Sequence, residues 1–126
     1  MKLIESNVEY IPQAEGLEGI YRQIEIAGRT AYKSEDKITD SSAKKFVDML
    51  IRNKHYAALE HGTVYMKIPD KTFQRDIYKW KIMIPNGCPY VHMNSNSICY
   101  YITTNYRYIL EGDIGIETAQ NYLCEP

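Results

Sequence analysis

The stretch that decides the fold is His55-Tyr56-Ala57-Ala58-Leu59-Glu60-His61, which continues as Gly62-Thr63-Val64-Tyr65-Met66. Its first part places two histidines and one carboxylate within seven residues. After it, Val64, Met66 and Ile68 alternate with more polar residues, which is the pattern of a half-buried strand, and Pro69 ends that strand. We therefore expect a polar junction between a helix and a strand at this point.

The segment before the junction predicts the clearest helix of the chain. Asp40-Ser41-Ser42 offers capping side chains, and apolar residues then recur at helical spacing at Ala43, Phe46, Val47, Leu50 and Ile51. An earlier helix is predicted from Leu17, Ile20, Tyr21, Ile24 and Ala27, with Gly28 placed to end it. Residues 29–37 are polar and turn-like, and residues 2–11 are strand-like at best.

The second half of the chain favours antiparallel β structure. Residues 70–75 look like a polar connection. Residues 78–84 alternate and favour a strand, although Phe73, Ile77 and Trp80 would also fit a helical stripe. Residues 89–93 and 98–103 predict the two strands of a hairpin around a polar turn at residues 94–97.

Two short helices are expected near the end of the chain. Thr104 or Asn105 can cap a helix that runs to Glu111 and stops at Gly112. A further helix is suggested by Ile116, Ala119 and Leu123. The expected fold is therefore one α+β domain over residues 1–126, with N-terminal helices packed on an antiparallel β-sheet.

Composition narrows the classes of function. The 126 residues are 44% hydrophobic and 25% charged, and the formal net charge is −1. That balance argues against a nucleic-acid binder held by a general basic field. No apolar run approaches the roughly 18–20 residues of a membrane span, and the N-terminus lacks a signal-peptide pattern. We expect a cytoplasmic protein that binds neither nucleic acid nor membrane.

Cysteine and tyrosine usage adds two expectations. Cys88, Cys99 and Cys124 are an odd number at wide spacing, which fits reduced thiols better than disulfides or a zinc site. Twelve tyrosines stand against two phenylalanines, and tyrosine suits half-buried sheets and wet interfaces. The chain is therefore expected to be rich in β structure or to form an oligomer contact.

The spacing of the two junction histidines does not suit a metal site. Zinc-binding helices place two histidines one turn apart on the same face. His55 and His61 lie six residues apart, and the remaining histidine, His92, is distant in the chain. A structural role is favoured, in which one histidine ends the helix and the other begins the strand. Physical chemistry alone thus predicts a polar junction and names no reaction.

Three stretches taken together resemble the N-terminal half of flavin-dependent thymidylate synthases. They are Gly28-Arg29-Thr30-Ala31-Tyr32-Lys33-Ser34, the capped helix from Ser41, and His55-Tyr56-Ala57-Ala58-Leu59-Glu60-His61. Their order matches a helix, an arginine-centred turn, a second helix, and then H-x-x-x-x-E-H running into a strand. Residues 101–107 and 122–126 look like an insertion found in a branch of that family.

The resemblance implies an activity and a set of ligands. Members of the family methylate dUMP reductively to dTMP. They use FAD as cofactor, methylenetetrahydrofolate as carbon donor and NADPH as reductant. The family is homotetrameric, with each flavin held at a subunit junction, which would suit the tyrosine content of this chain.

The resemblance also implies which residues lie near the cofactor. His55 matches a histidine beside the flavin, and Glu60 and His61 match the E-H pair at the strand start. Ala57 stands where a serine or threonine hydroxyl is usual, and Tyr56 where glutamate is common, so contacts are lost there. The cofactor-binding positions implied are Arg29, Ala31, His55, Ala57, Glu60 and His61.

The family's signature, RHRxxxxxxSxR, does not occur in these 126 residues. That signature supplies guanidinium groups for flavin and for the dUMP phosphate. The expectation is therefore the N-terminal part of a longer synthase that is inactive alone, and no catalytic residue or metal is assigned. The alternative is a non-catalytic α+β module that binds or assembles without flavin.

Overall fold

The computed structural model describes residues 3–76, 91–112 and 114–125. Within these ranges the chain forms α-helices α1 (Gly16–Ala31), α2 (Ala43–Arg52), α3 (Asp70–Arg75), α5 (Tyr106–Glu111) and α6 (Gly115–Ala119). It also forms 3₁₀ turns η1 (Glu35–Lys37), η2 (Tyr56–His61) and η3 (Gln120–Tyr122). The strands are β1 (Thr63–Pro69), β2 (His92–Ser95) and β3 (Cys99–Asn105).

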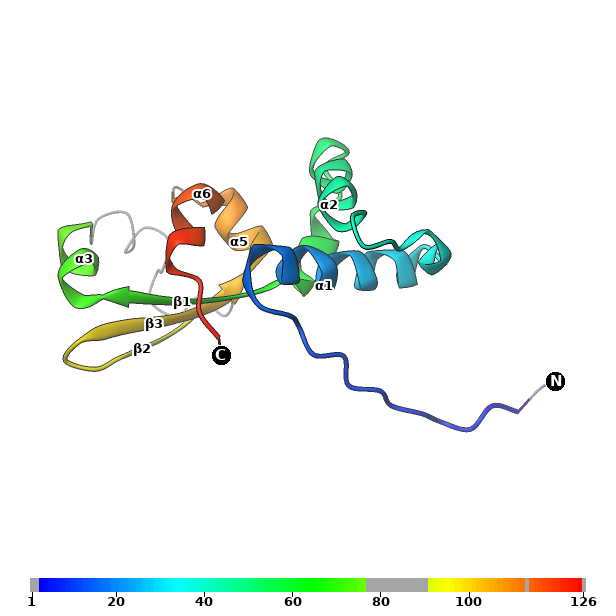
Figure 1. Cartoon of the computed structure of the whole chain (residues 1–126), viewed down its shortest axis with the longest axis horizontal. Helices are drawn as coiled ribbons and strands as arrows, with labels where there is room; N and C mark the ends of the chain where they lie inside the picture. Colours follow the sequence, from blue (N-terminus) through cyan, green and yellow to red (C-terminus); the bar gives the residue numbers. More distant parts are fainter. Residues whose placement is uncertain (1–2, 77–90, 113, 126) are drawn as a thin grey trace.

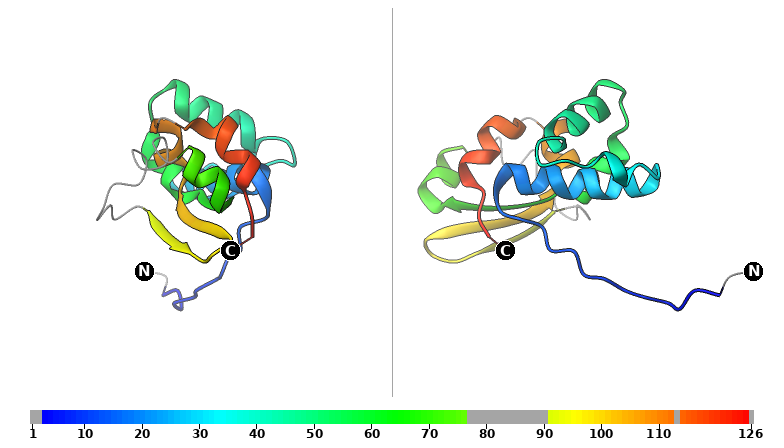
Figure 2. Two further views of the ribbon diagram at one scale, coloured as in Figure 1. Left: turned by 90° about the vertical axis from the view of Figure 1, so that its left-hand side faces the viewer. Right: turned by 45° about the vertical axis from the view of Figure 1, so that its right-hand side comes forward.

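The three strands form one antiparallel sheet in the order β1-β3-β2. The helices gather on one side of this sheet, as Figures 1 and 2 show. Facing residues Met66 and Ile102 are buried against them, while Lys67 and its partner Tyr101 are exposed on the other face. This arrangement confirms the α+β class, and the alternation that predicted β1 is seen in its burial pattern.

Helix α1 continues past Gly28, so the prediction that Gly28 ends it was wrong. Gly28 is buried under α2, and a Cβ at this position would lie 2.7 Å from the Phe46 ring. The missing side chain therefore permits close packing of two helices and does not terminate one. Arg29 and Ala31 consequently belong to the last turn of α1, where the sequence predicted a turn.

Both long helices end in the same way, with a lysine in the left-handed region. Lys33 follows α1 with φ 51°, and Lys54 follows α2 with φ 58°. The Ser34 amide donates to Arg29 O at 2.9 Å, and the His55 amide donates to Leu50 O at 2.8 Å. This is the Schellman pattern, which usually has glycine at that position because a side chain costs about 1 kcal/mol or more there.

Helix α2 begins at Ala43 as predicted, but its expected cap is used differently. Ser42 stands at the cap position without a side-chain capping bond. Its hydroxyl instead accepts from the Thr39 amide at 2.8 Å and lies 2.9 Å from the Glu25 carboxylate, to which it donates. The serine thus ties the start of α2 to α1.

Two buried residues, Leu59 and Gly62, hold the junction between α2 and β1 in place. Leu59 of η2 is fully buried. Gly62 lies so close under α1 that a Cβ would come within 2.7 Å of Ile20 and 2.8 Å of Ile24. The Tyr106 amide donates to Gly62 O at 2.8 Å, which attaches the start of α5 to this junction. β1 then follows and reaches Pro69, as predicted.

Residues 70–75 form helix α3, where the sequence predicted a polar connection. Phe73 is buried and stacks on Tyr100 of β3, with ring centroids 3.8 Å apart. This aromatic contact attaches an otherwise polar segment to β3. The predicted strand over 78–84 and Cys88 lie outside the described residues.

The predicted hairpin is confirmed for the described residues, with a shifted turn, while residues 89–90 of its first predicted strand lie outside them. β2 includes Asn94 and Ser95, which were expected in the turn. The turn is instead closed by the Asn96 side chain, which accepts from the Ile98 and Cys99 amides at 2.8 Å each. The short side chain of Asn96, and not the polarity of the whole stretch, sets where the strands end.

The end of the described chain matches one helix prediction and corrects another. The Asn105 side chain accepts from the Tyr108 amide at 2.9 Å, so α5 is capped as expected. α6 ends at Ala119, short of the predicted Leu123. Leu123 forms an isolated bridge with Met66 of β1. The predicted helical spacing thus corresponds to α6 continued by the 3₁₀ turn η3 as far as Tyr122, and only Leu123 is extended.

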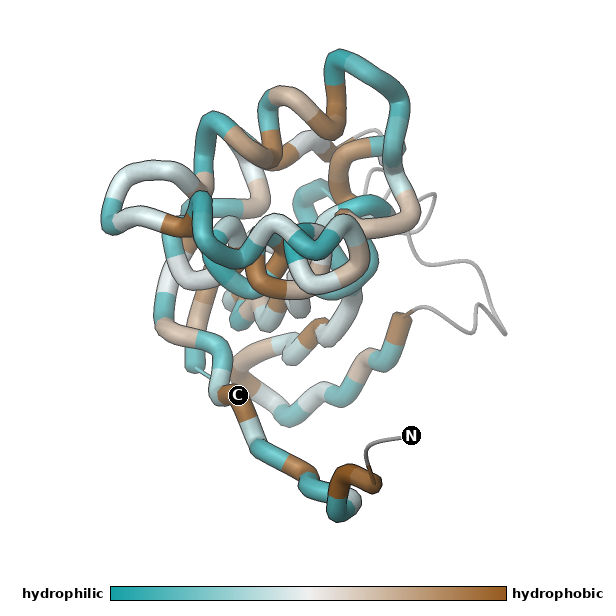
Figure 3. The backbone as a smooth tube through the Cα atoms, turned by 90° about the vertical axis from the view of Figure 1, so that its right-hand side faces the viewer, coloured by the Kyte–Doolittle hydropathy of each residue, from teal (hydrophilic) through white to brown (hydrophobic). Residues whose placement is uncertain are grey.

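Residues 3–11 are extended and contain no strand, contrary to the weak expectation from their sequence. They run away from the rest of the molecule in every view, and Figure 3 shows several apolar positions along them. Leu3, Ile4, Val8 and Tyr10 are each more than four-fifths exposed. This segment therefore contributes little to the core.

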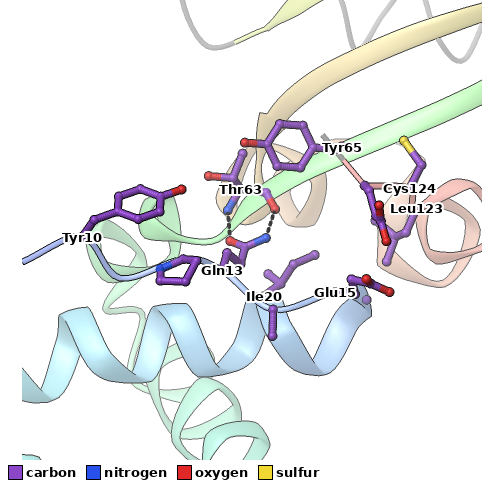
Figure 4. Close-up of a pocket in the computed structure, with 12 residues that line it drawn as sticks. Tyr10, Gln13, Glu15, Ile20, Thr63, Tyr65, Leu123 and Cys124 are labelled. Atoms are coloured by element: carbon purple, nitrogen blue, oxygen red, sulfur yellow. Dashed lines mark hydrogen bonds between the residues drawn. The ribbon is translucent and has the colours of Figure 1, made fainter.

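The N-terminal segment becomes attached at Gln13. Its side-chain amide donates to Thr63 O at 2.8 Å, and the Thr63 amide donates back to Gln13 Oε1 at 2.9 Å. Figure 4 shows this pair beside a hollow of about 240 Å³, with Tyr65, Leu123 and Cys124 around it. Gln13 thus completes the hydrogen bonding at the first residue of β1.

We expect Gln13→Ala to lower the free energy of unfolding by about 1–2 kcal/mol, because the Thr63 amide and carbonyl lose their partners together. Gln120→Ala, an exposed glutamine in η3, is the matched control and should change stability by less than about 0.5 kcal/mol. Urea denaturation of both variants measures the difference. Equal midpoints would show that water replaces Gln13 without loss.

Candidate functional site

The sequence-predicted site residues of the junction are presented on a short, firmly anchored turn. The buried Leu59 anchors η2 to the hydrophobic core. The side chains at His55, Ala57, Glu60 and His61 are all exposed. The left-handed Lys54 turns the chain out of α2 so that η2 can begin at once. The result is a row of polar and small side chains held at the surface by one buried leucine.

An open hollow of about 350 Å³ lies beside η2. Its lining comes from the ends of α1 and α2, from η2 and from α5, and consists of Tyr32, Lys54, His55, Tyr56, Ala57, Ala58 and Arg107. Two of the predicted site residues, His55 and Ala57, therefore meet in one depression. Tyr32, Lys54 and Arg107 are further lining residues that the sequence did not indicate.

Glu60 lies on the other side of Arg107. The Arg107 Nη1 donates to Glu60 Oε1 at 2.7 Å, and its Nε lies 3.4 Å from Glu111 Oε1. The hydrogen bond to Glu60 raises the pKa of Arg107 above its ordinary value, because it favours the charged guanidinium. These groups line a neighbouring depression together with Asn105 and Tyr108.

The sequence indicates one of the two carboxylate partners of Arg107 and gives no sign of the other. Arg107 and Glu111 are four residues apart on a capped helix, a spacing that brings side chains together. Glu60 is 47 residues from Arg107, and only the tertiary fold unites them. In the sequence Arg107 stood as one of several scattered arginines.

Arg29, predicted near the cofactor, is engaged elsewhere. Its Nε is 2.7 Å from Glu25 Oε1, and its guanidinium lies over the Phe46 ring, 4.6 Å from the centroid. The two side chains of the ion pair are only 14% and 2% exposed. Arg29 therefore does not line the hollow beside His55; its observed contacts join α1 to α2.

Ala31 and His61 also lie apart from the hollow. Ala31 is exposed in the last turn of α1, and the neighbouring Tyr32 reaches the hollow in its place. His61 is exposed at the far end of η2 and is not part of the lining. The structure thus brings together two of the six implied positions and places Glu60 next to them through Arg107.

The remaining titratable groups give no second centre. In residues 3–76, 91–112 and 114–125, no three histidine, cysteine or acidic side chains converge in a metal-binding arrangement. Cys99 and Cys124 are free thiols, and burial raises the pKa of Cys124. The same described residues contain no helix with the length and apolarity needed to cross a bilayer.

No family model, curated protein or solved structure matches this chain.

We expect Glu25→Gln to reduce the free energy of unfolding by about 3 kcal/mol, because a largely buried guanidinium loses its countercharge. Glu18→Gln is a matched control on the same helix, since the Glu18–Arg22 pair has the same spacing but side chains that are half exposed. That change should cost less than about 0.5 kcal/mol. Denaturant midpoints of the two variants that agree within error would contradict the structural role assigned to Arg29.

Proposed function

We propose that this chain is the N-terminal part of a flavin-dependent thymidylate synthase and contributes part of an FAD site. The observation that carries the proposal is the H-x-x-x-x-E-H segment on η2, with His55 and Ala57 on the open hollow and Glu60 beside it. Its place between α2 and β1 matches the order of elements on which the family resemblance depends.

The residues of the hollow suit one portion of a flavin. Tyr32 and Tyr56 offer aromatic surface, and His55 offers an imidazole that can stack or hydrogen-bond. Ala57 has no hydroxyl, so its contact with the flavin is van der Waals packing and includes no side-chain hydrogen bond. Glu60 is held by Arg107 at 2.7 Å, which keeps its carboxylate oriented toward the neighbouring depression.

FAD, when bound, supplies the redox and methylene-transfer chemistry by which dUMP becomes dTMP, with methylenetetrahydrofolate and NADPH as co-substrates. The hollow is too small to enclose a whole dinucleotide, so the remainder of the FAD would contact protein surface outside it. A homotetramer with shared sites provides such surface, as does the RHRxxxxxxSxR signature, which the proposal places outside these 126 residues. The assignments of Arg29, Ala31 and His61 stay predictions.

A non-catalytic assembly module is the second candidate, favoured by the exposed N-terminal segment. Leu3 and Val8 are 88% and 95% exposed, and a run of such apolar side chains is typical of a protein–protein contact. This candidate expects self-association or partner binding without flavin. Near-stoichiometric flavin in the purified chain would count against it.

We expect the chain to quench FAD fluorescence saturably and His55→Ala to weaken that binding about five- to ten-fold, the loss of one stacked or hydrogen-bonded group. His92→Ala is the matched control, because His92 is an equally exposed histidine on β2. It should leave the affinity unchanged.

Two results would oppose this reading. Equal FAD affinity in wild type and His55→Ala removes His55 from the site. A folded wild-type chain that binds no FAD, and that self-associates or binds a partner protein without it, favours the assembly module.

A further inference from the structure

Lys54 stands in a backbone conformation that glycine would adopt more easily. Its φ is 58°, and its own amide and that of His55 close the Schellman motif at the end of α2 by donating to Ile51 O and Leu50 O. Lys33 has the same motif at the end of α1, with φ 51°. Of these two lysines, Lys54 lines the hollow beside His55, and Lys33 is not part of that lining.

Among the described residues, the charged side chains that line the hollow beside His55 are all basic. Of the described residues that line it, Lys54, His55 and Arg107 are the basic groups, and none is a carboxylate. The two carboxylates that hold Arg107, those of Glu60 and Glu111, line the neighbouring depression instead. Only two of the five guanidinium N–H donors are used by them, so Arg107 retains donors for another acceptor.

Aromatic surface completes the lining. Tyr32 from the end of α1 and Tyr56 from η2 both contribute to the hollow. Cationic donors next to tyrosine rings suit a ligand that joins a phosphate to a planar base or ring. The formal net charge of the whole chain is −1, so any attraction for such a ligand is local to this place.

We propose that the hollow binds the phosphate of a ring-bearing phosphate ester, with Lys54 and Arg107 as the phosphate-contacting residues. The ligand chemistry is that of a flavin phosphate or a nucleotide. The inference deepens the proposed function, since FAD and dUMP both have this chemistry, yet it concerns residues that the family resemblance did not single out. Lys54 then contributes its charge to the hollow from a backbone conformation that glycine would adopt more easily.

Comparison of FMN with riboflavin isolates the phosphate, because the two differ only in that group. We expect Lys54→Gly to weaken FMN binding about tenfold, as for the loss of a charge-assisted hydrogen bond, and to leave riboflavin binding unchanged. Lys54→Arg should retain FMN affinity. Titration with dUMP by calorimetry tells whether a nucleotide phosphate or the flavin phosphate is preferred: the ligand whose affinity falls in Lys54→Gly occupies this place.

Lys33→Gly is the matched control, with the same substitution in the same motif. Both glycine variants should raise Tm by about 3 °C, because glycine relieves the left-handed strain. Only Lys54→Gly should lose FMN affinity. The stability gain also shows that a loss of binding does not come from unfolding.

The proposal is overturned if Lys54→Gly binds FMN and dUMP as the wild type does, or if the wild type binds neither. Its failure is distinct from failure of the proposed function. Unchanged phosphate binding in Lys54→Gly, together with weakened FAD binding in His55→Ala, would leave the flavin site standing without a phosphate contact from Lys54.

Discussion

The buried carboxylate of Glu25 is the constraint on which the arrangement of the first two helices depends. A charge removed from water needs partners close by, and Glu25 has the Arg29 guanidinium at 2.7 Å and the Ser42 hydroxyl at 2.9 Å. Because Arg29 belongs to α1 and Ser42 precedes α2, satisfying this one group fixes where α2 starts relative to α1. The ring of Phe46 then lies against Gly28 and under Arg29.

The position of the hollow follows from that packing. With α1 and α2 side by side, Tyr32 at the end of one and Lys54 at the end of the other come to line the same depression. η2 fills the space between α2 and the sheet. Leu59 within it and Gly62 after it are buried, while His55, Ala57, Glu60 and His61 are exposed. Polar side chains are thus presented at the surface by a short segment that buried residues attach to the core.

Local patterns predicted those parts of the fold whose causes are local. The spacing of Phe46, Val47 and Leu50 gave α2, and the alternation after Thr63 gave β1. The cap at Asn105 was also readable, because an asparagine accepts from an amide only three residues away. Gly28 misled because a glycine that ends a helix and one that admits a neighbouring ring have the same appearance in a sequence. α3 was missed because the stacking of Phe73 on Tyr100 is a tertiary contact.

The candidate site was predictable to a smaller degree. The family-like motif located His55 and Glu60, but Arg107 became part of the site only through a contact across 47 residues. The left-handed backbone of Lys54 has no sequence signal at all, since lysine is a poor choice for it. The engagement of Arg29 by Glu25 was equally hidden, although their four-residue spacing on a helix allowed it.

The amide of Gln13 has a consequence for how the protein behaves at high concentration. An open strand edge can template the strand of another molecule and so begin aggregation. At β1, Gln13 occupies both backbone groups of Thr63, and the Cys124 amide donates to Tyr65 O at 3.0 Å. Two segments from opposite ends of the sequence therefore cover the first half of this edge without adding a full strand. The Gln13 side chain and the extended backbone at Cys124 thus hinder the pairing of this edge with a strand of another molecule.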